Sequence, residues 1–132
     1  MAAEHTYDYA IIRIVPRVER GEQINVGVIL SCPALDFLDA RIELDETALH
    51  ALDPAVDLGE IRANLDVIPV VCRGGAPAGA IGHLSSRDRF RWLVSPRSTM
   101  IQPSPVHVGR TSDVAACLDR LLATLVRRVT SP

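Results

Sequence analysis

Lysine is absent from the sequence, and all 14 basic side chains are arginines. GC-rich coding can produce this composition as readily as chemistry can, so it indicates no function by itself. Aromatic residues are scarce, at 4%, which weakens the case for a nucleic-acid surface on which bases stack. No apolar run approaches the roughly 20 residues of a membrane span, and the first residues lack the basic and apolar segments of a signal peptide. We therefore expect a cytoplasmic protein without a membrane anchor.

Cysteine is also used sparingly. Cys32, Cys72 and Cys117 stand 40 and 45 positions apart, and none has a neighbouring cysteine or histidine that would complete a pair of metal ligands. The four histidines are scattered in the same way. We expect the cysteines to be small buried hydrophobic residues, and we expect no disulfide framework, metal site or bound cofactor.

The length of the chain suits one hydrophobic core. Its 132 residues, of which 48% are hydrophobic, can bury about two-thirds of the surface that the unfolded chain exposes. No internal repeat is visible, so residues 1–132 are expected to form a single α+β domain. Residues 73–80 consist almost entirely of glycine, alanine and proline, which predicts a flexible internal loop.

Charge is distributed unevenly along the chain. Residues 1–66 carry 5 arginines and 13 acidic residues, whereas residues 67–132 carry 9 arginines and 3 acidic residues. Such a division can mark a surface that binds an anion or a nucleic acid, or it can mean that the two halves pack together and neutralise one another. We favour packing, because a single small domain has few other places for opposite charges.

Three segments in the first third of the chain alternate apolar and polar residues with the period of a β-strand. They cover residues 7–15, 23–32 and 38–44. Their apolar positions are Ala10, Ile12 and Ile14, then Ile24, Val26, Val28 and Leu30, and finally Leu38, Ala40, Ile42 and Leu44. The segments predict an antiparallel meander.

Residues 45–68 predict two helices. The first covers residues 45–52 and is stopped by Pro54, and the second opens with a capping box at residues 57–60. The inward positions of the second helix are Leu58, Ile61, Leu65 and Ile68. Pro69 is expected to end or kink this helix, because proline lacks the backbone N–H that a helix interior uses.

The second half of the chain predicts two more helices and one or two edge strands. A helix at residues 85–93 is favoured over a strand, and three prolines enforce extended backbone near residues 98–102 and 106–108. Ser112 is expected to cap the last helix, and Arg127 and Arg128 lie at its C-terminal end, where positive charge is favourable. Its apolar stripe consists of Val114, Leu118, Leu121, Leu122, Leu125, Val126 and Val129. The whole pattern predicts an α+β fold, in which an N-terminal antiparallel meander is extended by one or two later strands and the helices pack on one face.

The hairpin formed by the first two strands is the first candidate surface. A turn near Glu19 would place Ile12 opposite Val26 and Arg13 opposite Asn25. The polar side chains would then form an anion-accepting wall, with Arg13, Arg17, Glu19 and Asn25 as its main members. The alternative is a solvated sheet face whose charged tip discourages edge pairing.

The segment 97–107 is the second candidate surface. Arginine offers a rigid fork for a phosphate or a carboxylate, and neutral donors follow it at intervals that an extended backbone could place along one groove. The residues singled out here are Arg97, Ser98, Gln102 and His107. The alternative is a scaffold, because polar side chains also satisfy backbone groups that prolines leave unpaired.

Two further interpretations have weaker support. Ser104 and His107 suggest a serine nucleophile, but the sequence has no Gly-x-Ser-x-Gly elbow and no nearby acid to complete a triad. The arginines of residues 87–97 flank Phe90 and Trp92, a combination that can hold nucleic acid. Burial of these two aromatic rings in the core explains them more simply, so nucleic acid is not the expected partner.

Three long motifs carry a family resemblance. They cover residues 7–13, 16–27 and 96–107, and the last two coincide with the candidate surfaces. The chain resembles a family of small bacterial proteins known only as domain of unknown function 3037. The resemblance implies no activity. It implies an accessory or partner role beside a HipA-like kinase, because members of the family are often encoded next to one.

Two functions remain open. The first is a non-enzymatic cytoplasmic interaction module, whose polar hairpin and 97–107 segment contact a partner protein or a small anionic ligand. The second is an enzyme or a nucleic-acid-processing accessory that acts on a phosphate-bearing substrate. The second function requires Arg13, Arg97 and His107 to converge in one concave site, with Glu19 or Glu22 as a carboxylate.

Overall fold

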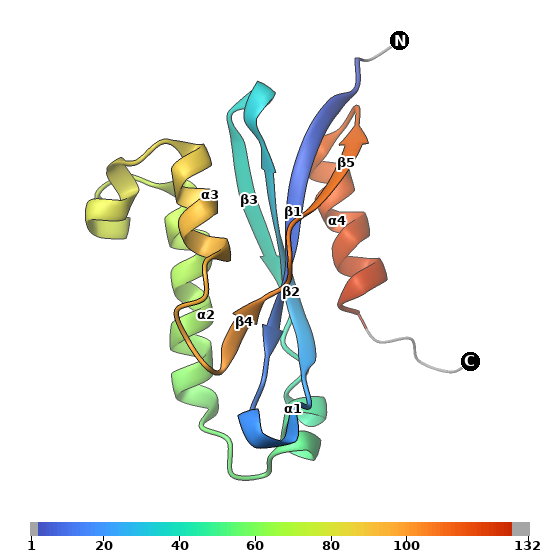
Figure 1. The fold of residues 1–132 in the computed structure, drawn as a ribbon, viewed down its shortest axis with the longest axis vertical. Helices are drawn as coiled ribbons and strands as arrows, with labels where there is room; N and C mark the ends of the chain where they lie inside the picture. Colours follow the sequence, from blue (N-terminus) through green and yellow to red (C-terminus); the bar gives the residue numbers. More distant parts are fainter. Residues whose placement is uncertain (1–2, 128–132) are drawn as a thin grey trace.

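An antiparallel sheet forms the centre of the fold (Figure 1). The structure is a computed structural model and describes residues 3–127. The strands are β1 (His5–Ile14), β2 (Ile24–Cys32), β3 (Phe37–Ile42), β4 (Ile101–Pro103) and β5 (His107–Thr111). They follow the order β3-β2-β1-β4, and β5 pairs with β1 beside β4. The predicted meander, its extension by two later strands and the α+β class are confirmed.

Each helix begins directly after a residue whose short polar side chain caps it. The helices are α1 (Glu46–Leu52), α2 (Leu58–Arg73), α3 (Ser86–Val94) and α4 (Val114–Leu125). Asp45, Asp57 and Ser85 each accept a hydrogen bond from the backbone N–H three residues later, at 3.0 to 3.1 Å. These caps satisfy N–H groups that have no partner within the helix. The predicted helix starts near residues 45, 57 and 85 are confirmed.

Two predicted helix boundaries were wrong. Asp113, not Ser112, caps α4, because its carboxylate accepts the N–H of Ala116 at 3.1 Å. Of the two outcomes expected for Pro69, the end of the helix is contradicted, because α2 continues to Arg73, and the kink stays a prediction. Burial of the last turn against the core outweighs the hydrogen bond that proline cannot donate. The predicted positions Arg128 and Val129 lie outside the described residues.

The helices cover both faces of the sheet, so the expectation that they pack on one face was wrong. One core cluster joins the sheet to α2 and α3, and the second joins it to α4. Figure 1 shows α2 and α3 on one side of the strands and α4 on the other. The second cluster contains the buried α4 residues Val114, Cys117, Leu118 and Leu122.

An irregularity in β2 explains why both faces are apolar. Ile12 pairs with Gly27 and Arg13 pairs with Asn25, so Val26 is an extra residue in β2. The predicted partner of Arg13 was therefore right, but Ile12 does not lie opposite Val26. The extra residue reverses the alternation of side chains: Ile24 and Val26 belong to the cluster with α2 and α3, whereas Val28 and Leu30 belong to the cluster with α4.

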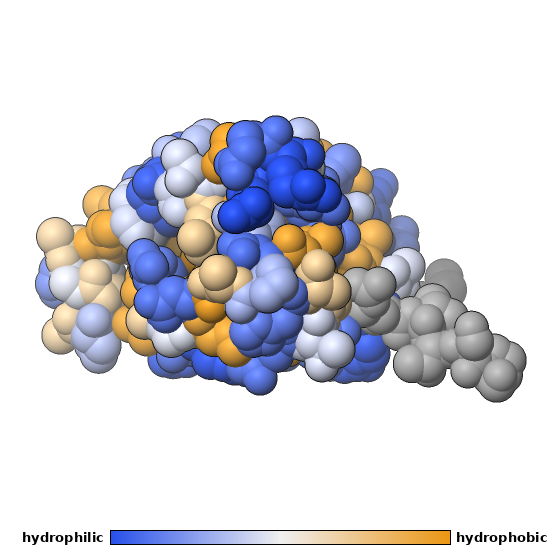
Figure 2. Space-filling view, turned by 90° about the horizontal axis from the view of Figure 1, so that it is seen from below, coloured by the Kyte–Doolittle hydropathy of each residue, from blue (hydrophilic) through white to orange (hydrophobic). Residues whose placement is uncertain are grey.

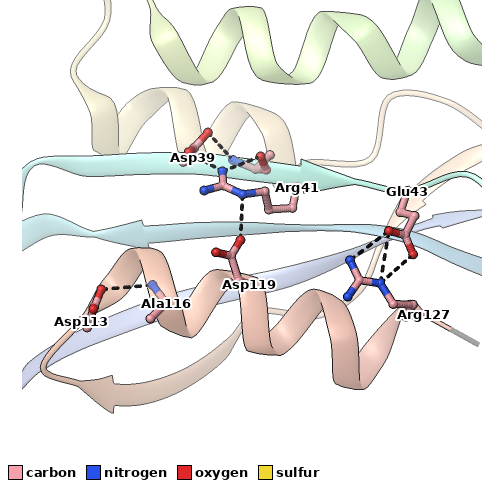
Figure 3. A network of polar contacts seen from close by, with 8 residues as sticks. Asp39, Arg41, Glu43, Asp113, Ala116, Asp119 and Arg127 are labelled. Carbon is pink, nitrogen blue, oxygen red and sulfur yellow. Dashed lines mark hydrogen bonds and ion pairs between the residues drawn. The ribbon is translucent and has the colours of Figure 1, made fainter. Parts of the chain in front are cut away.

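Ion pairs fasten the two charged halves of the chain together. Asp8 on β1 contacts Arg87 on α3 at 2.6 Å. On the other face, Arg41 on β3 contacts Asp119 on α4 at 3.0 Å, and Glu43 contacts Arg127 at 3.0 Å (Figure 3). The hydrogen bonds from Arg127 hold the pKa of Glu43 below its usual value. These contacts support packing as the cause of the uneven charge.

The small-residue segment 73–80 spans a helix end and a 3₁₀ helix. Gly74 and Gly75 follow α2 with positive φ angles of 72° and 80°, a conformation that suits glycine. The 3₁₀ helix η3 (Ala76–His83) comes next, and Gly75 donates a backbone hydrogen bond to Gly82 at 2.9 Å. The flexibility of this segment stays a prediction.

The three cysteines are buried and unbridged, as predicted. Burial raises the pKa of the Cys72 thiol to about 12, which suppresses the reactive thiolate. We therefore expect the folded protein to resist a disulfide reagent such as DTNB at about pH 8, and the protein in guanidinium chloride to react at all three cysteines. The reaction is measured by absorbance, and rapid labelling of Cys72 in the folded protein would contradict its burial.

Candidate functional site

A cavity of about 290 Å³ opens between α2, α3 and the segment that leads into β4. Four of its lining residues belong to the buried core, namely Ile12, Ile29, Ile68 and Leu93. The others are Asn64, Val67, Trp92, Ser95, Arg97, Ser98, Ile101 and Pro103. The lining is therefore mostly apolar, with a few polar groups that could orient a ligand.

Arg97 is held in place at this cavity. Its guanidinium carbon lies 3.6 Å from the centre of the Trp92 ring, a cation–π contact. Its Nη1 donates to the backbone carbonyl of Trp92, and to that of Ser95 at 3.2 Å. The next residue, Ser98, stabilises the loop, because its Oγ accepts hydrogen bonds from the N–H groups of Met100 and Ile101.

The charge of Arg97 is not neutralised within residues 3–127. None of the ion pairs among these residues includes Arg97, whereas Arg41 of β3 and Arg87 and Arg91 of α3 each contact a carboxylate. Partial burial lowers the pKa of Arg97 below its usual value. A guanidinium that has lost part of its hydration without gaining a carboxylate is a favourable place for an anion to bind.

Trp92 was expected in the core together with Phe90, and this expectation was right only for Phe90. Phe90 and Leu93 are buried, whereas Trp92 is half-buried and lines the cavity. Helix geometry explains the difference, because residues three apart share a face and residues two apart do not. The spacing of Phe90, Trp92 and Leu93 could thus have identified Trp92 as the residue that leaves the core.

Arg13, Asn25 and Gln102 form a row across three strands. Asn25 pairs with Arg13, and Arg13 pairs with Gln102. Arg13 donates to the backbone carbonyls of Gln102 at 3.3 Å and Pro103 at 3.1 Å, and Asn25 donates to the carbonyl of Leu125 at 2.9 Å. These side chains hold β4 and the end of α4 in place. Because side chains alternate along a strand, Arg13 points away from the face on which Ile12 lines the cavity.

Arg17 and Glu19 lie at the exposed tip of the hairpin. Glu19 belongs to the short 3₁₀ helix η1 (Val18–Arg20), which Arg17 precedes. Figure 2 looks onto this end of the molecule, where hydrophilic side chains gather between smaller hydrophobic areas. Val15, just before the tip, donates a backbone hydrogen bond to Met100 at 2.7 Å. The end of β1 that leads into the tip therefore lies beside the loop that carries Arg97 and Ser98.

His107 and Ser104 belong to the strand edge. His107 pairs with Tyr9, and their rings lie 5.3 Å apart. Ser104 is buried, and its Oγ accepts from the N–H of Ile11 at 2.8 Å and donates to the carbonyl of Pro105 at 2.9 Å. The hydroxyl thus bridges the gap in pairing between β4 and β5, as the scaffold interpretation of this segment predicts.

The eight predicted residues do not form one site. The structure brings Arg97 and Ser98 to the cavity, and it places the other six elsewhere on the sheet or at the hairpin tip. Residues 3–127 contain no group of three or more histidine, cysteine, aspartate or glutamate side chains that could hold a metal ion. None of the described helices is long and apolar enough to cross a membrane.

The residues that build the cavity, from Ile12 to Pro103, all fall within one family model. This model, described as protein of unknown function (DUF3037), matches residues 9–126. The chain belongs to the DUF3037 family. No curated protein and no solved structure shows significant similarity to this DUF3037 chain.

Proposed function

We propose that this DUF3037 protein is a non-enzymatic cytoplasmic interaction module, and that the Arg97 cavity accepts an anionic group of a partner protein. The observation that carries the proposal is the guanidinium of Arg97, which stacks on Trp92 at a mainly apolar cavity and pairs with no described carboxylate. Apolar walls provide binding energy and the single cation provides orientation and specificity.

The arrangement supports binding rather than catalysis. An enzyme acting on a phosphate-bearing substrate was expected to bring Arg13, Arg97 and His107 together. Arg13 and His107 are not among the cavity residues, and Arg13 already donates to two backbone carbonyls. Ser104 is buried, and its hydroxyl is engaged in two hydrogen bonds with the backbone, so it is poorly placed as a nucleophile.

The family resemblance favours a HipA-like kinase as the first candidate partner. The exposed Arg17 and Glu19 at the hairpin tip offer a second contact for the same partner, because Val15, next to the tip, is hydrogen-bonded to the loop after Arg97.

Replacing Arg97 with alanine is expected to abolish capture of the partner. A charge-assisted contact at the centre of an interface contributes roughly 2 kcal/mol or more, which corresponds to a loss of about 30-fold or more in affinity. The measurement is a pull-down from the native host with the tagged protein, quantified by mass spectrometry, after circular dichroism has shown that the variant folds.

Arg91→Ala is the matched control. Arg91 lies on the same helix as Trp92, is exposed, and contacts Asp88 three residues earlier at 3.3 Å. Exposed pairs of this kind contribute little, so this variant should capture the partner as the wild type does. Equal capture by the wild type and Arg97→Ala would place the interface elsewhere and reject the proposed role of the cavity.

A further inference from the structure

A second hollow adjoins the Arg97 cavity along α2. It measures about 330 Å³ and is lined by Ala63, Asp66, Val67, Val70, Val71, Pro77, Ala78, Ile81 and Trp92. Val67 and Trp92 line both hollows, and Val67 is 46% exposed although it is apolar. The two hollows therefore adjoin at Val67 and Trp92, and together they are called the track.

The track has a cationic end at Arg97 and a mainly apolar end, whose one charged lining residue is Asp66. The first hollow is bounded by Arg97, Ser98, Ile101 and Pro103, which belong to the loop and strand at β4. The second hollow contains none of these residues and is lined instead by α2, by Trp92 and by Pro77, Ala78 and Ile81 of η3. A bound chain could therefore leave the Arg97 cavity along α2, whereas the loop and β4 bound the cavity at its Arg97 end.

The free edge of Arg97 suits a carboxylate. Nη1 is occupied by the carbonyls of Trp92 and Ser95, whereas Nε and Nη2 donate to no atom of residues 3–127. These two nitrogens form the side of the guanidinium that donates two parallel hydrogen bonds to a carboxylate. The fixed Nη1 and the Trp92 ring hold that side in one orientation.

We infer that the track binds the free C-terminus of a partner protein that ends in an apolar residue. The terminal carboxylate receives the Nε and Nη2 donors of Arg97, and the last side chain enters the cavity beside it. The preceding residues cross Val67 and Trp92 into the second hollow. A C-terminal residue fits this arrangement for two reasons. Its carboxylate and its apolar side chain are attached to the same carbon, so both can enter the cavity together, and the rest of the peptide leaves that carbon in a single direction. This inference rests on the proposed function and specifies the group that the cavity recognises.

Tryptophan provides a direct probe, because Trp92 is the single tryptophan of the sequence. The ligands are three acetylated pentapeptides: Gly-Ser-Val-Ala-Leu with a free carboxylate, the same peptide with a C-terminal amide, and Gly-Ser-Val-Asp-Leu with an amide. Binding to the full chain is followed by Trp92 fluorescence and by the NMR signal of its indole N–H. The free acid is expected to bind at least about tenfold more tightly than either amide.

Matched variants locate the contact. Arg97→Gln should reduce binding of the free acid to the level of the amide, whereas Arg91→Gln should not. Val67→Asp places a charge on the track and should weaken binding of the free acid. Val18→Asp makes the same change at a residue of η1 that is 56% exposed, and it should leave binding unchanged.

Three results would overturn the inference: equal binding of acid and amide, equal or tighter binding of the aspartate peptide, or no binding of the free acid up to about 1 mM. If one of these three results is found while Arg97→Ala still abolishes partner capture, a C-terminus is rejected as the ligand, and the proposed interaction site at Arg97 is kept. If Arg97→Ala leaves capture intact, the proposed function itself is rejected.

Discussion

Replacing Phe90 with alanine is expected to lower the free energy of unfolding by about 3–5 kcal/mol. Phe90 is 1% exposed and is the largest fully buried side chain of the described residues. It belongs to the core cluster between the sheet and the helices α2 and α3. Alanine would remove the whole ring and leave a cavity that β2 cannot move to fill, because β2 is paired with both β1 and β3. Urea unfolding followed by circular dichroism measures the change.

Two other substitutions control for this effect. Phe90→Leu keeps much of the apolar volume and should cost clearly less than Phe90→Ala. Leu35→Ala removes a side chain that is 48% exposed and should change the stability by no more than about 0.5 kcal/mol. Similar losses for Phe90→Ala and Leu35→Ala would show that α3 is not anchored by its aromatic ring.

The same substitution connects stability with the candidate site. α3 carries Phe90 on its buried face and Trp92 at the cavity, and Arg97 follows directly after the helix. A loosened α3 should therefore change the fluorescence of Trp92 under conditions in which the variant is still folded. The position of the guanidinium of Arg97 depends in this way on packing several residues earlier in the chain.

Elements with a local cause could be predicted from the sequence. Asp45, Asp57 and Ser85 are capping residues whose hydrogen bonds reach only three positions ahead, so the helix starts were visible without the fold. The strands were visible for the same reason, because alternation is a property of a single segment. Pro69 shows the limit of this reasoning, since its effect was decided by the packing of the turn that follows it.

The layer arrangement depends on contacts between distant segments and could not be predicted. Alternating residues of β2 were assigned to one face, but the extra residue Val26 moves Val28 and Leu30 to the other. A bulge is set by pairing between two strands and leaves little trace in either one. The second apolar face is what gives α4 a place to pack.

The candidate site was predicted in part. Arg97 and Ser98 were identified because polar residues cluster among prolines, whereas Val67 and Trp92 carry no such signal and come from two different helices. Arg13 and Asn25 belong to an equally polar cluster, yet they donate to backbone carbonyls of Pro103 and Leu125. Polarity alone does not separate a side chain that binds a ligand from one that satisfies the backbone.

Replacing Gly27 with alanine is expected to lower the free energy of unfolding by about 2–3 kcal/mol or more. A Cβ atom at this position would lie 2.7 Å from the backbone oxygen of Arg41 and 2.9 Å from Cδ1 of Ile12. The side chain of Ile12 can adjust, but the oxygen of Arg41 belongs to β3 and moves only if β3 separates from β2. Thermal and urea unfolding measure the loss.

Gly59→Ala is the matched control for this substitution. Gly59 lies in the first turn of α2, where a Cβ atom would meet only Oδ1 of Asp57, at an ordinary distance of 3.4 Å. Alanine should stabilise this helix by up to about 1 kcal/mol, because it loses less conformational entropy on folding than glycine. The two variants are thus expected to change stability in opposite directions. A neutral Gly27→Ala would mean that β3 can move away from β2 at Arg41 without cost, which would contradict the tight contact of these two strands.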